Sequence, residues 1–126
     1  MDNTIKHLLL EAKNNPSILA IVLFGSKARG DAGPLSDTDL CIIAPTIKQK
    51  DKLNILAYSS DKVDITFFED LPLNIKVRVI QEGKTFLNKN KRLLDDLFWH
   101  TLKEYIDFRI HRAKLIETYL PGASYV

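Results

Sequence analysis

Apolar residues along the chain alternate between short unbroken runs and helical spacing. The run Ile18–Phe24 is continuous, rich in β-branched residues and closed by Gly25, and it predicts a strand buried on both faces of a sheet. The runs Thr38–Ala44 and Lys62–Phe68 predict two further strands, and a short fourth strand is expected at residues 84–87. This order of strands, separated by helical patterns, indicates an α/β (α+β) fold.

Helical spacing predicts the elements between and around these strands. Apolar residues recur at intervals of three and four in each segment, and polar or helix-stopping residues bound it. Helices are expected over Thr4–Asn14, from Ser26 as a short turn, over Ile47–Tyr58, and over residues 72–82, which Gly83 would end. The sheet is therefore expected to be small and flanked by helices.

The last helical pattern is unusually long. It continues from Lys91 to Leu120, where Pro121 and Gly122 end it. An unbroken helix of this length would span about 45 Å, which is more than a domain of this size can cover. Two arrangements stay open: a bend near Arg109 that returns the tail to the sheet, or a straight helix of which a part meets another chain.

The composition fits one domain over residues 1–126, with a core over about 16–88 and a C-terminal helical segment over about 91–120. Of the 126 residues 45% are hydrophobic, and a second full domain would not fit. The net charge of +2, from 18 basic and 16 acidic residues, does not by itself indicate a nucleic-acid or membrane surface. Without a long apolar run, a signal-peptide pattern or a pair of cysteines (Cys41 is the only one), a cytoplasmic location is expected.

Three aspartates stand out as candidate metal ligands. Asp37 and Asp39 open the second strand, and because they are two residues apart their side chains should point to the same side. Asp64 can project beside this pair if the third strand is a neighbour of the second. Adjacent carboxylates repel one another unless a cation lies between them, and Mg²⁺ prefers such oxygen ligands, with phosphates completing its shell. The pattern predicts a site for two metal ions and a nucleoside triphosphate.

A Gly-Ser turn precedes the paired acids and supplies candidate phosphate-binding residues. Gly25 allows the backbone to pass close to phosphates, and Ser26 offers a hydroxyl and backbone N–H groups at the following helix start. Lys27 or Arg29 can neutralise charge on a leaving pyrophosphate. Arg29 is favoured, because its planar guanidinium can bind two oxygens at once.

Each of these features has an ordinary explanation when it stands alone. A Gly-Ser turn is commonly a plain strand-to-helix connection, and an isolated Asp-X-Asp is commonly a solvated turn. Asp64 needs no catalytic role on an exposed strand face, and Asp61 is a nearby substitute. The basic residues of 84–92 lack interleaved aromatic residues, so a solvated rim is favoured over direct nucleic-acid binding. The combination of turn, paired acids and third acid is what favours metal-dependent nucleotide chemistry.

The motif GSKARG at residues 25–30, followed by SDTDL at residues 36–40 and a strand aspartate, Asp64, resembles the minimal nucleotidyltransferase (MNT) family of the polymerase-β superfamily. The resemblance implies a polymerase-β-like nucleotidyltransferase core with a small mixed sheet. In that family Gly25 and Ser26 would bind the triphosphate of ATP. Asp37, Asp39 and Asp64 would be the catalytic, Mg²⁺-binding carboxylates.

The resemblance also implies a biological setting. Proteins of this size are similar to the antitoxins of HEPN/MNT toxin–antitoxin pairs, whose partner is a small helical HEPN ribonuclease. Some of these antitoxins transfer AMP from ATP to a tyrosine of the toxin, which is the function expected here. Two alternatives stay open: a nucleotidyltransferase for a small molecule such as an antibiotic, with a homodimer forming the acceptor pocket, and a toxin-binding module without catalysis.

Overall fold

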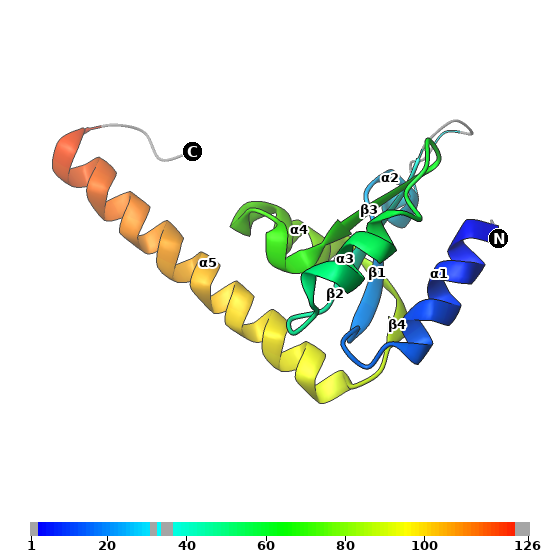
Figure 1. Cartoon of the computed structure of the whole chain (residues 1–126). Coiled ribbons are helices and arrows are strands. Elements are labelled where there is room, and N and C mark those ends of the chain that lie inside the picture. The colour runs from blue at the N-terminus through cyan, green and yellow to red at the C-terminus, as the bar shows by residue number, and fades with distance from the viewer. Residues whose placement is uncertain (1–2, 31–32, 34–36, 123–126) are drawn as a thin grey trace.

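A mixed four-stranded sheet forms the centre of the protein, in a computed structural model that describes residues 3–30, 33 and 37–122 (Figure 1). Its strands are β1 (Ala20–Phe24), β2 (Thr38–Ile43), β3 (Val63–Phe67) and β4 (Lys84–Asn88), in the spatial order β3-β2-β1-β4. The pairs β1–β2 and β1–β4 are antiparallel, and the pair β2–β3 is parallel. The predicted small mixed sheet is confirmed.

Helices cover both faces of this sheet. The first face packs against α1 (Asn3–Asn14) and α3 (Gln49–Leu56), and the second against α4 (Leu73–Glu82) and the first half of α5 (Lys91–Tyr119). Two short elements, α2 (Ser26–Arg29) and the 3-10 helix η1 (Phe68–Asp70), follow the ends of β1 and β3. The central strands are therefore buried on both sides, as their unbroken apolar runs predict.

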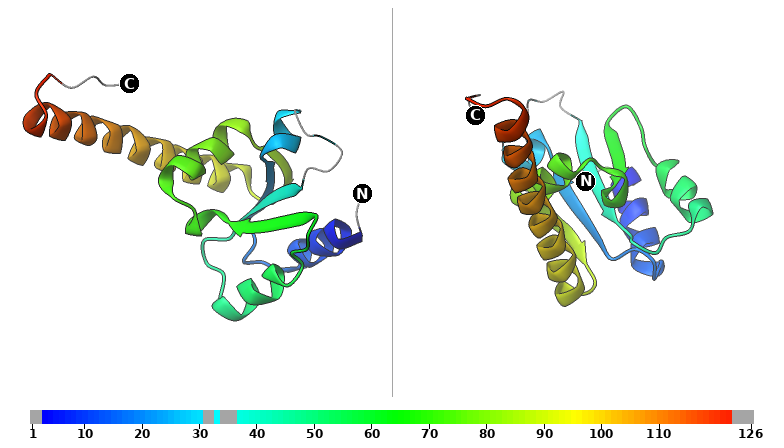
Figure 2. Two further views of the ribbon diagram at one scale, coloured as in Figure 1. Left: turned by 90° about the horizontal axis from the view of Figure 1, so that it is seen from above. Right: turned by 90° about the vertical axis from the view of Figure 1, so that its left-hand side faces the viewer.

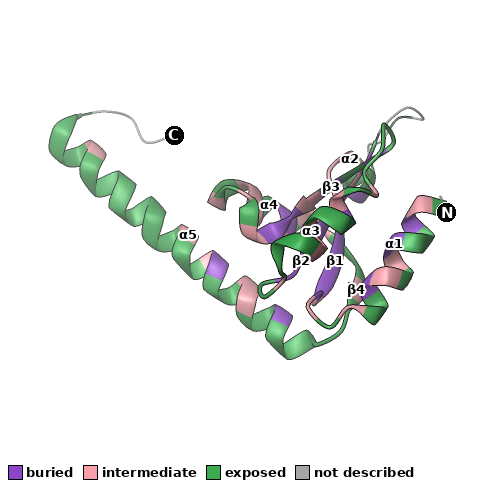
Figure 3. Ribbon diagram, in the orientation of Figure 1, coloured by how far each residue is buried: buried purple, intermediate pink, exposed green. Residues whose placement is uncertain are grey.

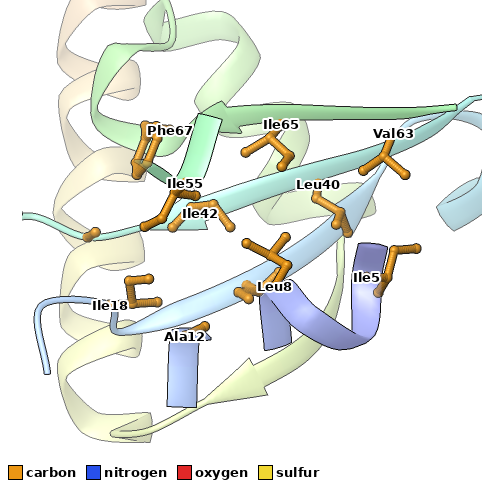
Figure 4. Packing of buried hydrophobic residues seen from close by; sticks show 12 residues of the cluster. Ile5, Leu8, Ala12, Ile18, Leu40, Ile42, Ile55, Val63, Ile65 and Phe67 are labelled. Carbon is orange, nitrogen blue, oxygen red and sulfur yellow. The ribbon is translucent and has the colours of Figure 1, made fainter. Parts of the chain in front are cut away.

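Alternate residues of each strand belong to different cores, because strand side chains alternate between faces. The core on the α1 face takes Ile21 from β1 and Leu40 from β2. Figure 4 shows Leu40 among the side chains of this core. The core on the α4 face takes Val22 and Cys41, the next residues along these strands. Figure 3 shows the buried residues concentrated on the strands and on the helix faces that contact them. Both cores hold the register of β1 against β2.

Two elements, β1 and α3, differ from their predicted bounds by two residues at an end. β1 begins at Ala20 because the amide of Ile18 donates to Asn15 O at 3.1 Å in a turn. The helix predicted over Ile47–Tyr58 is shorter: α3 begins only at Gln49 and ends at Leu56. Hydrophobic spacing alone does not reveal these turns, because their residues are as apolar as those of the neighbouring elements.

The long C-terminal helix is continuous. α5 runs over 29 residues without a break at Arg109, so the bend that was one of two predicted arrangements is not found. Asn90 caps its start by accepting a hydrogen bond from the amide of Leu93 at 3.2 Å. The second half of α5 extends away from the rest of the protein (Figures 1 and 2). We call residues 105–119 the distal arm.

The distal arm exposes several large apolar side chains. They are Ile106 (55% exposed), Phe108 (52%), Ile110 (51%), Leu115 (43%) and Tyr119 (75%). Scattered exposed apolar residues are ordinary, but a run of them along one projecting helix is typical of an interaction surface. None of the helices in the described ranges is long and apolar enough to cross a membrane.

Two leucines of α5 test this arrangement. Leu94 is 3% exposed and packs in the core of the α4 face, whereas Leu115 is 43% exposed on the distal arm. Leu94→Ala should lower the free energy of unfolding by about 2–5 kcal/mol, because it leaves a cavity. Leu115→Ala should change it by less than about 0.5 kcal/mol. Urea denaturation of the two variants measures both values, and equal losses would contradict a projecting arm.

Candidate active site

The strand register places three side chains in one row across the sheet. Phe24 of β1 pairs with Asp39 of β2, and Asp39 pairs in turn with Asp64 of β3. Directly paired strand residues point to the same face. Cys41, two residues after Asp39 on the same strand, belongs to the core of the α4 face. Asp39 and Asp64 therefore project together on the α4 face, at the end of the sheet where β1 ends and β2 and β3 begin.

Asp39 is the electrostatic centre of this row. Its side chain is partly buried, and burial is the largest cause that raises its pKa above the ordinary value. The negative charges of Asp64 and then Asp37 raise this pKa further, while Arg29 and Lys27 oppose the shift. Asp64 and Asp37 are thus each close enough to Asp39 for their charges to act on its carboxylate.

The carboxylates fit a divalent cation by their chemistry. No three His, Cys, Asp or Glu side chains in the described part of the chain are arranged to hold a metal ion as they stand. Asp37 and Asp64 are exposed, so their side chains can turn toward Asp39 without losing a packed position. Carboxylate oxygens are the ligands that Mg²⁺ prefers, and it commonly takes only one or two of them together with substrate phosphates. A cation would also relieve the repulsion that raises the pKa of Asp39.

Gly25 makes the sharp turn that brings α2 against this row. Its φ of 78° and ψ of −156° lie in a region that only glycine adopts readily. A Cβ atom at this position would collide with the Asp39 carboxylate. Ser26 follows at the first position of α2, and the amide of Arg29 donates to Gly25 O at 3.1 Å, which closes the turn. The predicted glycine, serine and acid are therefore brought together.

The two candidate cations of α2 differ in what they contact. The Lys27 ammonium donates to Thr38 Oγ1 at 2.7 Å, and Thr38 is buried, so Lys27 ties α2 to the start of β2. Arg29 Nη1 lies 3.4 Å from Glu82 Oε2 of α4, in an ion pair where both side chains are about one-third exposed. Arg29 thus faces α4, and Lys27 has a structural partner.

Two further charged residues beside this site have no sequence signal of their own. Arg78 and Glu82 of α4 line a cavity of about 130 Å³ together with Phe24, Gly25 and Arg29. They lie four residues apart, which is also the spacing of any solvated helix face. Only the packing of α4 next to the end of β1 reveals that this face borders the Gly25 turn.

Cys41 is a core residue, as its apolar surroundings predict. Burial raises the pKa of the Cys41 thiol to about 12, and the negative charge of Glu69 adds to the shift. A thiol with such a pKa is not ionised at neutral pH and is a poor nucleophile. Cys41 is therefore not a candidate nucleophile.

Replacing Gly25 should disturb the acids as well as the fold. We expect Gly25→Ala to destabilise the protein by at least about 1–3 kcal/mol from backbone strain. It should also displace Asp39, because the new Cβ collides with its carboxylate. Gly30→Ala is the control: its φ of 82° is also strained, but no atom of the described residues lies within 4 Å of the place its methyl group would take. Thermal denaturation and Mg²⁺ titration of both variants should show loss of cation binding for Gly25→Ala alone.

Removing the charge of Asp39 should stabilise the protein when no cation is present. Its pKa in the folded state lies above the ordinary value, so folding binds protons between the two pKa values, and stability falls as the pH rises through them. Asp39→Asn should therefore melt at a higher temperature than the wild type at pH 7 in EDTA. Mg²⁺ should raise the melting temperature of the wild type and have a smaller effect on Asp39→Asn. A wild-type melting temperature that does not respond to Mg²⁺ would contradict the cation site.

Known proteins share this architecture. A chain of a toxin–antitoxin crystal structure with AMP-PNP superposes with a TM-score of 0.68, 24% sequence identity and coverage of 92% of this chain and 95% of that one. A chain of the complex between a tri-AMPylated Shewanella oneidensis HEPN toxin and an MNT antitoxin gives a TM-score of 0.61, 21% identity and 92% coverage of both. At these identities the likeness establishes the fold, which is the predicted nucleotidyltransferase fold.

Sequence similarity gives the family. A candidate protein adenylyltransferase of Methanocaldococcus jannaschii is 31% identical over 81 residues, which is 64% of this chain and 65% of that protein, so the match spans slightly less than two thirds of its length. Residues 3–92, from α1 to the start of α5, match the family described as polymerase beta, nucleotidyltransferase. This match spans well over half of the sequence and includes the Gly25 turn and all three aspartates, and the protein therefore belongs to the polymerase beta nucleotidyltransferase family.

Proposed function

We propose that this protein transfers AMP from ATP to a hydroxyl group of a partner protein, with Asp37, Asp39 and Asp64 as its Mg²⁺ ligands. The observation that carries the proposal is the pairing of Asp39 with Asp64 directly beside the Gly25 turn. Family membership supports nucleotidyl transfer. The bound AMP-PNP in one structural neighbour supports an adenine nucleotide as substrate.

Each residue of the site has a separate role in this reaction. Gly25 and Ser26 hold the triphosphate close to Asp39, because a glycine at the turn leaves the backbone free of a side chain that would block it. Arg29 offsets negative charge on the departing pyrophosphate. Asp37, Asp39 and Asp64 would hold Mg²⁺, which would screen phosphate charge and lower the pKa of the attacking hydroxyl. In the transfer the hydroxyl oxygen gives its proton to the surrounding water and bonds to the α-phosphorus. The bond between the α-phosphorus and the oxygen that bridges to the β-phosphate breaks, and pyrophosphate leaves with that oxygen.

We further propose a HEPN-type toxin as the partner and a tyrosine hydroxyl of that toxin as the acceptor, so that the protein acts as an antitoxin. The structural neighbours are chains of toxin–antitoxin complexes, and in one of them the HEPN toxin carries three AMP groups. The distal arm of α5 supports a protein partner, because its large apolar side chains are exposed on this chain. Between this arm and α4 lies a hollow of about 400 Å³ that Tyr105, Phe108 and Arg109 help to line.

The proposal is tested by mass spectrometry of the partner. The purified protein is incubated with ATP, Mg²⁺ and a HEPN protein encoded beside it, and the partner should gain one or more AMP masses. Asp37→Asn combined with Asp39→Asn should abolish this gain, since the ligands of the cation are lost. Asp70→Asn is the control, because Asp70 is an exposed aspartate that pairs with Lys52 at 2.5 Å and lies outside the site.

Three outcomes separate the alternatives. Full transfer by the double variant would overturn the assignment of the aspartates. Toxin neutralisation by the double variant as effective as that of the wild type, with no transfer by either, would favour a binding module without catalysis. Release of pyrophosphate with added small molecules, and no mass gain on the partner, would favour a small-molecule acceptor.

A further inference from the structure

We propose that Arg78 of α4 joins Arg29 in binding the terminal phosphates of the nucleotide, and that Glu82 holds Arg29 when no nucleotide is bound. This inference rests on the proposed nucleotide site and adds to it two residues that the sequence motif does not contain. It starts from the cavity of about 130 Å³ that the end of β1, α2 and α4 enclose.

The cavity lies next to the Asp39 carboxylate. Gly25 lines it, and Gly25 is in contact with Asp39, where any Cβ would meet the carboxylate. Phe24, another lining residue, is the strand partner of Asp39. A nucleotide whose α-phosphate lies at Asp39 therefore has its β- and γ-phosphates within reach of this cavity, since each further phosphate extends the chain by only about one phosphorus–oxygen bridge.

One face of α4 forms the opposite wall. Ile75, Arg78 and Glu82 are three and four residues apart, so they lie on one side of the helix. Ile75 is apolar and partly buried, whereas Arg78 is exposed and is a charged residue among those that line the cavity. Arg78 and Arg29 thus approach the same space from two elements. Two planar guanidinium groups around one cavity match the several oxygens of a terminal diphosphate.

The ion pair between Arg29 and Glu82 holds the Arg29 side chain beside the cavity before a nucleotide binds. Its atoms are 3.4 Å apart, and the two side chains are 37% and 34% exposed. Such a partly solvated pair contributes little stability. A phosphate oxygen near both arginines can therefore replace the carboxylate as the partner of Arg29. Glu82 then acts as a built-in competitor that the nucleotide must displace.

The test compares ATP with AMP, which lacks the terminal phosphates. Isothermal titration calorimetry measures binding of each nucleotide, and of inorganic pyrophosphate, in the presence of Mg²⁺ and without any acceptor. Arg78→Ala should weaken binding of ATP and pyrophosphate by about tenfold or more, as expected for the loss of charge-assisted hydrogen bonds, and leave AMP binding within about twofold. Arg78→Lys should recover part of the loss, because it restores the charge without the planar fork.

Glu82→Gln gives an independent and opposite result. It removes the competing carboxylate, so ATP and pyrophosphate should bind more tightly than to the wild type, while AMP should not. Arg92→Ala is the matched control for loss of one positive charge, because Arg92 lies in the first turn of α5, near the opposite end of the sheet. Circular dichroism melts establish that all variants are folded.

The outcomes are distinct from those of the transfer experiment. An unchanged ATP affinity for Arg78→Ala, or an equal loss for ATP and AMP, would overturn the inference even if the wild type transfers AMP. A selective loss of ATP and pyrophosphate binding would support it even if the wild type transfers AMP to no partner, in which case the proposed function fails alone. Unchanged or weaker ATP binding by Glu82→Gln would overturn the competitor role of Glu82.

Discussion

The candidate site depends above all on the register of three paired strands. Asp39 has Phe24 as its partner on β1 and Asp64 as its partner on β3. Backbone pairing therefore places two acids from different segments side by side on one face, and no contact between their side chains is needed to hold them there. A slip of one residue in β2 would turn Asp39 to the other face of the sheet. Such a slip would also move Leu40 and Ile42, which are fully buried in the core of the α1 face, to the α4 face. The two cores that stabilise the fold therefore also hold Asp39 and Asp64 in position.

The charged end of the sheet is compatible with this fold because the side chains of Asp37 and Asp64 are exposed there. Next to Asp39 on the same face of β2 comes Cys41, which is buried, and its strand partner Thr66 is partly buried. Ile43, the following residue on this face, is fully buried, so the surroundings change from charged to apolar within a few residues of β2. This short distance accounts for the partial burial that raises the pKa of Asp39. It also gives Gly25 its importance, since the turn after β1 passes where any larger residue would meet the carboxylate.

Much of this arrangement could be predicted from the sequence, because it depends on local patterns. Unbroken apolar runs identified β1 to β3, and the two-residue spacing of Asp37 and Asp39 suggested one site. Arg78 and Glu82 could not be found in this way, because their position beside Gly25 depends on how α4 packs, a contact between residues about fifty positions apart. The continuity of α5 was likewise undecided, because helical period is the same in a straight helix and in two helices joined by a bend. The roles of the aspartates in binding metal stay predictions.

The straight α5 has a consequence for how a bound partner would react. Its 29 residues span about 43 Å, and only the first half is packed on the sheet. A partner held on the distal arm would share one rigid body with the aspartates, and its hydroxyl groups would search a small volume instead of the surrounding solution. Attachment of this kind produces effective concentrations of about millimolar. Encounter with the acceptor would then be set by the geometry of the complex, and the abundance of either protein in the cell would govern only how often the complex forms.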